Sequence, residues 1–87
     1  MTVLKIDPQL SAIICALSEL GEDSTIPKNI RIKVIDIINV LSDETEISIR
    51  VNKVLDELEE IANDANIQPY TRTQVWNVIS LLGNNGF

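Results

Sequence analysis

Apolar residues of this 87-residue chain recur at intervals of three and four over four separate stretches. This spacing places them on one face of an α-helix, so the pattern predicts four amphipathic helices. The stretch 30–41 is rich in β-branched residues, which also suit a strand, but its spacing fits a period of 3.6 residues better than a period of two. The predicted core consists of Leu10, Ile13, Ile14, Leu17, Leu20, Ile30, Val34, Ile37, Ile38, Leu41, Ile47, Val51, Val54, Leu55, Leu58, Ile61, Ala62, Val75, Val78, Ile79 and Leu82.

Prolines mark the starts of three predicted helices, because proline fits the first helical turn, where no amide donor is needed. They are Pro8, Pro27 and Pro69. Asp7 precedes the first of them and can accept a hydrogen bond from a free amide. For the helix that follows residue 46, Asp43 with Glu46 resembles a capping box that has Asp in the cap position.

Glycines mark the ends of the first and last predicted helices. Gly21 and Gly83 stand where a helix can end in a left-handed conformation. Residues 1–6 are predicted to be a short extended lead, and residues 84–87 a flexible tail.

The second half of the chain repeats the first. Residues 10–41 align with residues 51–82 without a gap and with eight identities in 32 positions. Repeats of this length built from helix pairs are typical of HEAT-like units. Two amphipathic hairpins also align this well by periodicity alone, so a true duplication and a coincidence both stay open.

These patterns predict an all-α protein of one domain, residues 1–87. Short links between successive helices favour antiparallel neighbours and hence a four-helix up-and-down bundle built from two similar helical hairpins. A HEAT-like pair is the alternative, but two such repeats would leave large faces uncovered.

Composition narrows the classes of function. The formal net charge is −6, which opposes direct nucleic-acid binding, because that affinity comes from Lys and Arg. The single cysteine, Cys15, excludes an internal disulfide and favours a reducing compartment. There is no apolar run long enough to span a membrane and no secretory signal pattern. We therefore expect a cytoplasmic protein with no membrane partner.

Sequence signals for catalysis are lacking. The chain has no histidine, the commonest general base and transition-metal ligand. It also has no glycine-rich phosphate loop. The acidic residues of 56–60 could bind a hard cation, but a solvated helix face is the better interpretation. We expect no enzyme activity and no cofactor, metal or catalytic residue.

Three arginines follow an aspartate at a similar short spacing and lie in the first turns of helices. They are Arg31, Arg50 and Arg72. A cation there opposes the helix dipole and needs compensation. We expect each to pair with an aspartate or a carbonyl of the preceding loop; an anion site is the alternative. Together with Pro27 and Pro69, these arginines are predicted to be structural.

Uncharged outer faces on the first and last helices predict a contact surface. The residues concerned are Ala12, Cys15, Ala16, Thr73, Trp76, Asn77, Ser80 and Leu81. The first and last helices of an up-and-down bundle are neighbours, so the two faces could join and form a homodimer interface. Trp76, the single tryptophan, is either an anchor of that interface or a residue at the core edge.

The segment Pro69–Asn77, PYTRTQVWN, resembles an uncharacterised family of small archaeal all-helical proteins. The segments 27–31 and 55–61 add to the likeness, which covers roughly residues 10–82. The chain departs from the family at Ala65, where proline is usual, and at Tyr70, where histidine is usual. The resemblance implies a four-helix bundle and an archaeal cytoplasm, and it supplies no activity, cofactor or catalytic residue.

The hypothesis that follows is a non-enzymatic protein–protein interaction module that self-associates and has an unknown protein partner. The alternative is an accessory subunit of a nucleic-acid-handling assembly that acts through protein contacts.

Overall fold

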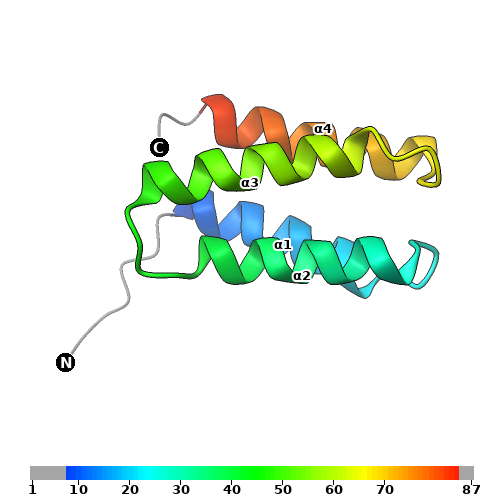
Figure 1. The fold of residues 1–87 in the computed structure, drawn as a ribbon, viewed down its shortest axis with the longest axis horizontal. Coiled ribbons are helices and arrows are strands. Elements are labelled where there is room, and N and C mark those ends of the chain that lie inside the picture. The colour runs from blue at the N-terminus through cyan, green and yellow to red at the C-terminus, as the bar shows by residue number, and fades with distance from the viewer. Residues whose placement is uncertain (1–7, 85–87) are drawn as a thin grey trace.

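The computed structural model describes residues 8–84, and these form four helices. Their bounds are α1, Pro8–Glu22; α2, Lys28–Leu41; α3, Ile47–Ala62; and α4, Pro69–Asn84. Figure 1 shows two antiparallel hairpins, α1–α2 and α3–α4, stacked with their long axes nearly aligned. The predicted all-α class is confirmed.

The packing closes the four helices into a ring. Within the described residues, α1 packs beside α2 and α4, and α3 beside α2 and α4, whereas the two diagonal pairs have no Cα atoms within 8 Å of each other. The first and last helices are therefore neighbours, as the bundle prediction requires. A HEAT-like stack would leave one side of this ring open, so the structure favours the bundle over the alternative.

The core repeats in the register of the sequence alignment between 10–41 and 51–82. Ala62 apart, every buried residue in the described part has a buried equivalent in the other hairpin. The nine pairs are Leu10 and Val51, Ile13 and Val54, Leu17 and Leu58, Leu20 and Ile61, Ile26 and Ile67, Ile30 and Thr71, Val34 and Val75, Ile37 and Val78, and Leu41 and Leu82. The two hairpins thus bury equivalent positions, and burial of these aliphatic side chains is the main stabilising term.

The predicted core agrees with the structure. The predicted residues are either buried or packed against the buried cluster. The sequence interpretation missed Ile26 and Ile67, which precede α2 and α4 and are 3% and 5% exposed. They close the same end of the two hairpins from equivalent loop positions.

Two predicted helix ends were wrong by one residue. Gly21 and Gly83 lie inside their helices, since α1 continues to Glu22 and α4 to Asn84. A Cβ placed at Gly21 would lie 3.5 Å from Cγ1 of Ile35, so this glycine faces α2. Of the predicted tail, Asn84 belongs to α4; residues 85–87, the lead 1–6 and the cap Asp7 fall outside the described residues.

The predicted capping box before α3 was also wrong. The N-cap of α3 is Glu46, and no side chain caps the helix. Asp43 instead accepts hydrogen bonds from the backbone N–H of Glu44 at 2.7 Å and from the hydroxyl of Thr45 at 3.2 Å. Asp43 therefore stabilises its own loop, because its carboxylate accepts hydrogen bonds from the next two residues and not from an amide in the first turn of α3.

Candidate protein-interaction faces

The predicted structural arginines donate hydrogen bonds to backbone carbonyls of the connection before their helices or of the last residue of the preceding helix. The Nε of Arg31 donates to the carbonyl of Ile26 at 3.0 Å. Arg72 makes two such bonds, from Nε to the carbonyl of Ala62 at 2.8 Å and from Nη2 to the carbonyl of Asp64 at 2.9 Å. These bonds match the interpretation in which each arginine ties a loop to the start of a helix.

Arg50 ties the α2–α3 connection in a different way. Its Nη1 donates to the carbonyl of Leu41, the last residue of α2. Its Nε is buried and is the one such side-chain atom without a hydrogen-bond partner in the described residues. A cation held against the last carbonyls of a helix also offsets the partial negative charge there.

Aspartates at equivalent positions shape the two hairpin loops. One oxygen of Asp23 accepts hydrogen bonds from the backbone N–H of Thr25 at 2.9 Å and from its hydroxyl at 2.6 Å. Asp64 accepts from the backbone N–H of Asn66 at 2.7 Å. The bonds from the side chain and backbone of Thr25, with a weaker contribution from the charge of Arg31, hold the pKa of Asp23 below its ordinary value.

The exposed surface of α4 carries no charge. Arg72 is the single charged residue of Pro69–Asn84, and its guanidinium is engaged with the preceding loop. Three large side chains are exposed on this helix: Tyr70 at 68%, Trp76 at 45% and Leu81 at 46%. Thr73, Asn77 and Ser80 are also exposed. On a chain with a net charge of −6, such a face is unusual.

Trp76 lies on the flank of α4 that adjoins α3. It stands one helical turn after Arg72, which places both side chains on one side of the helix. The Arg72 guanidinium reaches Ala62 at the end of α3, so that side faces α3. The exposed ridge of α4, formed by Thr73, Asn77 and Ser80, therefore separates Trp76 from the α1–α4 seam. The predicted contact residues extend around α4, and Trp76 lies at their border on the α3 side.

The opposite flank of α4 meets α1. A hollow of about 110 Å³ lies on this seam and is lined by Ala16, Glu19, Leu20, Asp23, Tyr70, Gln74 and Val78. Among the predicted contact residues, Ala16 lines the hollow, and Ala12 and Cys15 are exposed farther toward the start of α1.

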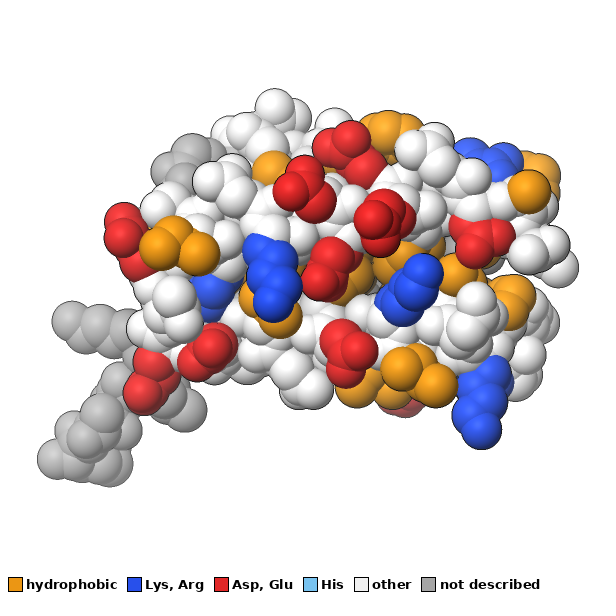
Figure 2. Space-filling model, in the orientation of Figure 1, with side chains coloured by type: hydrophobic (Ala, Val, Ile, Leu, Met, Phe, Trp, Pro, Cys, Tyr) orange, Lys and Arg blue, Asp and Glu red, His pale blue; other side chains and the backbone are white. Residues whose placement is uncertain are grey.

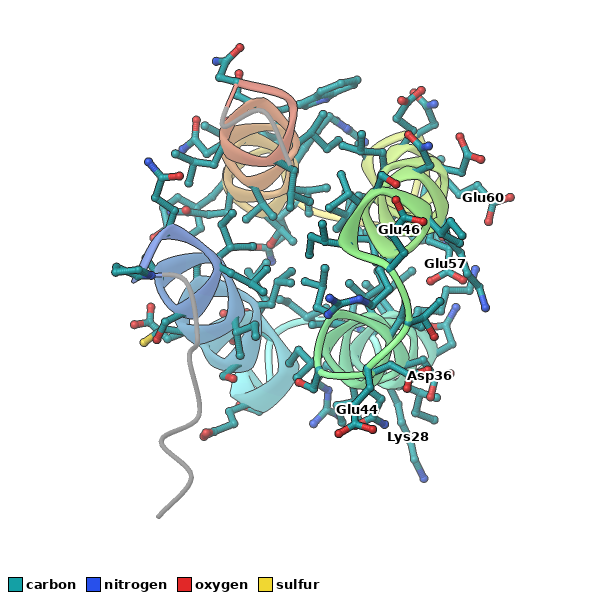
Figure 3. The ribbon with its side chains drawn as sticks, turned by 90° about the vertical axis from the view of Figure 1, so that its left-hand side faces the viewer. Lys28, Asp36, Glu44, Glu46, Glu57 and Glu60 are labelled. Atoms are coloured by element: carbon teal, nitrogen blue, oxygen red, sulfur yellow. The ribbon has the colours of Figure 1, made fainter. Side chains whose placement is uncertain are left out.

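Charged side chains dominate the opposite seam, between α2 and α3. Lys33, Asp36, Glu57 and Glu60 line a hollow of about 130 Å³ there. Figure 2 shows acidic and basic side chains mixed over this face, and Figure 3 shows Asp36, Glu57 and Glu60 on one side of the bundle. No cluster of acidic, histidine or cysteine residues in the part of the chain that the structure describes could hold a metal ion.

None of the four helices within residues 8–84 is long and apolar enough to cross a membrane.

Comparison with known proteins gives a consistent result. A family model described as an uncharacterised protein family, UPF0147, matches residues 2–84. The UPF0147 protein TV0625 of Thermoplasma volcanium is 38% identical over 92% of this chain and 92% of its own. The UPF0147 protein of Methanosarcina mazei is 39% identical over 76% of this chain and 72% of its own.

Solved structures agree with the fold. The crystal structure of a protein of unknown function, MMP1188, superposes with a TM-score of 0.83 at 34% identity and covers 94% of this chain and 97% of its own. A member of UPF0147 from Thermoplasma acidophilum gives the same TM-score at 37% identity, over 86% of this chain and 89% of its own. The resemblance expected from the sequence is confirmed.

Proposed function

This chain belongs to the uncharacterised protein family UPF0147, which has no known activity, and we propose from its surfaces that it is a non-enzymatic protein–protein interaction module of the cytoplasm that associates with a second copy of itself. The observation that carries this proposal is the uncharged outer face of α4 with three large exposed side chains. Trp76 lies on the α3 side of this uncharged face and Tyr70 and Leu81 on its α1 side, and exposed apolar surface on a small protein commonly marks a contact site.

Electrostatics favour a second copy as the occupant of this face. In a two-fold contact the same residues lie on both sides, so a charged face would meet its own charge. The face between α2 and α3 carries several carboxylates and would repel its copy. The ridge of α4, formed by Thr73, Asn77 and Ser80, avoids that cost.

The shape of the face supplies an anchor as well. Thr73, Asn77 and Ser80 are small or medium-sized, so two α4 helices could approach closely along the ridge. Trp76 borders the ridge on the α3 side, and Leu81 with Ala12 borders it on the α1 side. Tryptophan is enriched among residues that carry binding energy, and Trp76 is 45% exposed in the single chain.

Sedimentation equilibrium from low to high micromolar concentration tests the proposal. The wild-type chain should reach twice its monomer mass, and its tryptophan fluorescence should shift to the blue as Trp76 becomes covered. Trp76→Glu would place a charge in the contact and should weaken dimerisation at least about tenfold.

The matched control is Ile49→Glu, which places the same charge at an exposed isoleucine of α3 outside the proposed contact. This variant should dimerise like the wild type. A wild-type monomer at high micromolar concentration, or equal weakening by both substitutions, would contradict self-association through α4.

A further inference from the structure

The hollow between α1 and α4 combines groups suited to one kind of ligand. Glu19 and Asp23 contribute two carboxylates from the end of α1 and the loop that follows. Tyr70 and Gln74 face them from the first two turns of α4. No lysine or arginine lines this hollow, unlike the hollow between α2 and α3.

The carboxylates are available to a ligand. No hydrogen bond or ion pair within residues 8–84 engages the carboxylate of Glu19, which is exposed. Asp23 uses one oxygen, Oδ1, for both bonds from Thr25, which leaves Oδ2 open. The bonds to Oδ1 also fix the orientation of the Asp23 carboxylate, so less ordering is required when a ligand binds.

Apolar groups lie beside the carboxylates. Ala16, Leu20 and Val78 line the same hollow, and the last two belong to the buried core. Tyr70 is 68% exposed, and the face of an aromatic ring attracts a cation. An apolar wall beside carboxylates and an aromatic ring suits a positive charge at the end of an aliphatic chain.

We infer that this hollow binds a primary alkylammonium group, the lysine side chain of a protein partner. A lysine stem would lie against Ala16, Leu20 and Val78, and its ammonium would meet Glu19, Asp23 and the ring of Tyr70. The compact ammonium needs a single acceptor oxygen, which Oδ2 of Asp23 offers, whereas the planar guanidinium of arginine pairs best with both oxygens of one carboxylate.

Charge over the whole chain points to the same partner. A net charge of −6 attracts basic proteins and speeds their association. The inference goes beyond self-association and does not depend on it, because Ala12 and Leu81 lie toward the other end of the α1–α4 seam.

Titration of the full-length ¹⁵N-labelled protein, followed by NMR, tests the site. The probes are Nα-acetyl-lysine methylamide, the norleucine analogue that lacks the ammonium, and 1,5-diaminopentane. The lysine probe should shift the amide signals of Ala16, Leu20, Gln74 and Val78, and the norleucine probe should leave them in place.

Substitutions separate this site from general attraction to an acidic surface. Glu19→Gln should weaken the lysine probe about two- to fivefold, the range for one exposed ion pair. Tyr70→Leu should also weaken it, because the aromatic face is lost. Glu60→Gln, in the hollow between α2 and α3, is the matched control and should leave affinity unchanged.

Three results would overturn the inference. Equal binding of the norleucine probe would show that the ammonium is not recognised. Binding of 1,5-diaminopentane without binding of the lysine probe would assign the hollow to a free amine and not to a protein partner. Equal weakening by Glu19→Gln and Glu60→Gln would show that the probe senses only net charge.

Discussion

The two hairpins of this protein agree in their interiors and differ on their surfaces. Equivalent residues of the two aligned halves are buried in α1–α2 and α3–α4, and backbone hydrogen bonds repeat with them. The N–H of Asp23 donates to Leu20 and that of Asp64 to Ile61. Yet the exposed residues equivalent to Ile35 and Asp36 are Trp76 and Asn77. The shared positions maintain the fold, so the differences between the hairpins indicate where each has a role of its own.

The largest expected effect tests the equivalence of the two interiors. Leu17 and Leu58 are each 0% exposed and occupy equivalent positions in the two hairpins. Leu17→Ala and Leu58→Ala should each lower the free energy of unfolding by about 2–5 kcal/mol, because each leaves a cavity of similar size. Chemical denaturation measures both values.

Ile49→Ala, at a side chain that is 57% exposed, is the control for this pair and should cost much less. A large difference between Leu17→Ala and Leu58→Ala would show that equal burial does not give equal energy in the two hairpins.

A smaller effect tests where the hairpins diverge. Arg72 donates one hydrogen bond to the last residue of α3 and one to the loop that follows, and Arg31 donates one bond through Nε. Arg72→Ala should lower the free energy of unfolding by about 1–3 kcal/mol, and Arg31→Ala by an amount at the lower end of that range. Chemical denaturation of both variants beside the wild type measures the difference.

Lys28→Ala serves as the control for both arginines, since this exposed lysine starts α2 and its side chain makes no hydrogen bond within residues 8–84. An unchanged free energy of unfolding in Arg72→Ala would contradict the structural role of this arginine and would favour the alternative, an anion site.

The smallest expected effect is on the stability of the folded protein at acidic pH. The lowered pKa of Asp23 stabilises the folded protein at pH values above the unfolded pKa, and this contribution is lost as the pH falls through the lower folded pKa. Asp23→Asn should therefore make the decline of stability below about pH 4 shallower. Thermal unfolding at a series of pH values measures it.

Thr25→Ala sharpens the same comparison. It removes the hydrogen bond from the Thr25 hydroxyl to Asp23. Within the described residues of the second hairpin, Asp64 accepts no equivalent bond from a side chain. It should reproduce part of the Asp23→Asn effect. An acid profile identical to that of the wild type in both variants would assign the decline to other carboxylates.

Most of the fold could be predicted from the sequence because the core is aliphatic and regularly spaced. The missed residues Ile26 and Ile67 lie in loops, where helical periodicity gives no signal, and Thr71 of α4 was missed because its side chain is polar. The predicted cap at Asp43 was wrong because the residue types of a capping motif do not show which backbone amide lies nearest to the carboxylate.

The candidate surfaces were predicted less completely. The lack of charge on the outer face of α4 is visible in the sequence. Which neighbouring helix Trp76 lies beside depends on how α4 is rotated in the bundle. The hollow between α1 and α4 joins Glu19 and Asp23 to Tyr70 and Gln74, which belong to the other hairpin. Such a grouping requires the packed structure, because no local pattern connects the two segments.

The ring of four helices has a topological consequence. The start of α1 and the end of α4 lie at the same end of the bundle as the connection between α2 and α3, as Figure 1 shows. The order of the two hairpins along the chain is therefore not required by their packing. A short linker from the end of α4 to the start of α1, with new termini within residues 43–45, would exchange that order and leave every helix intact.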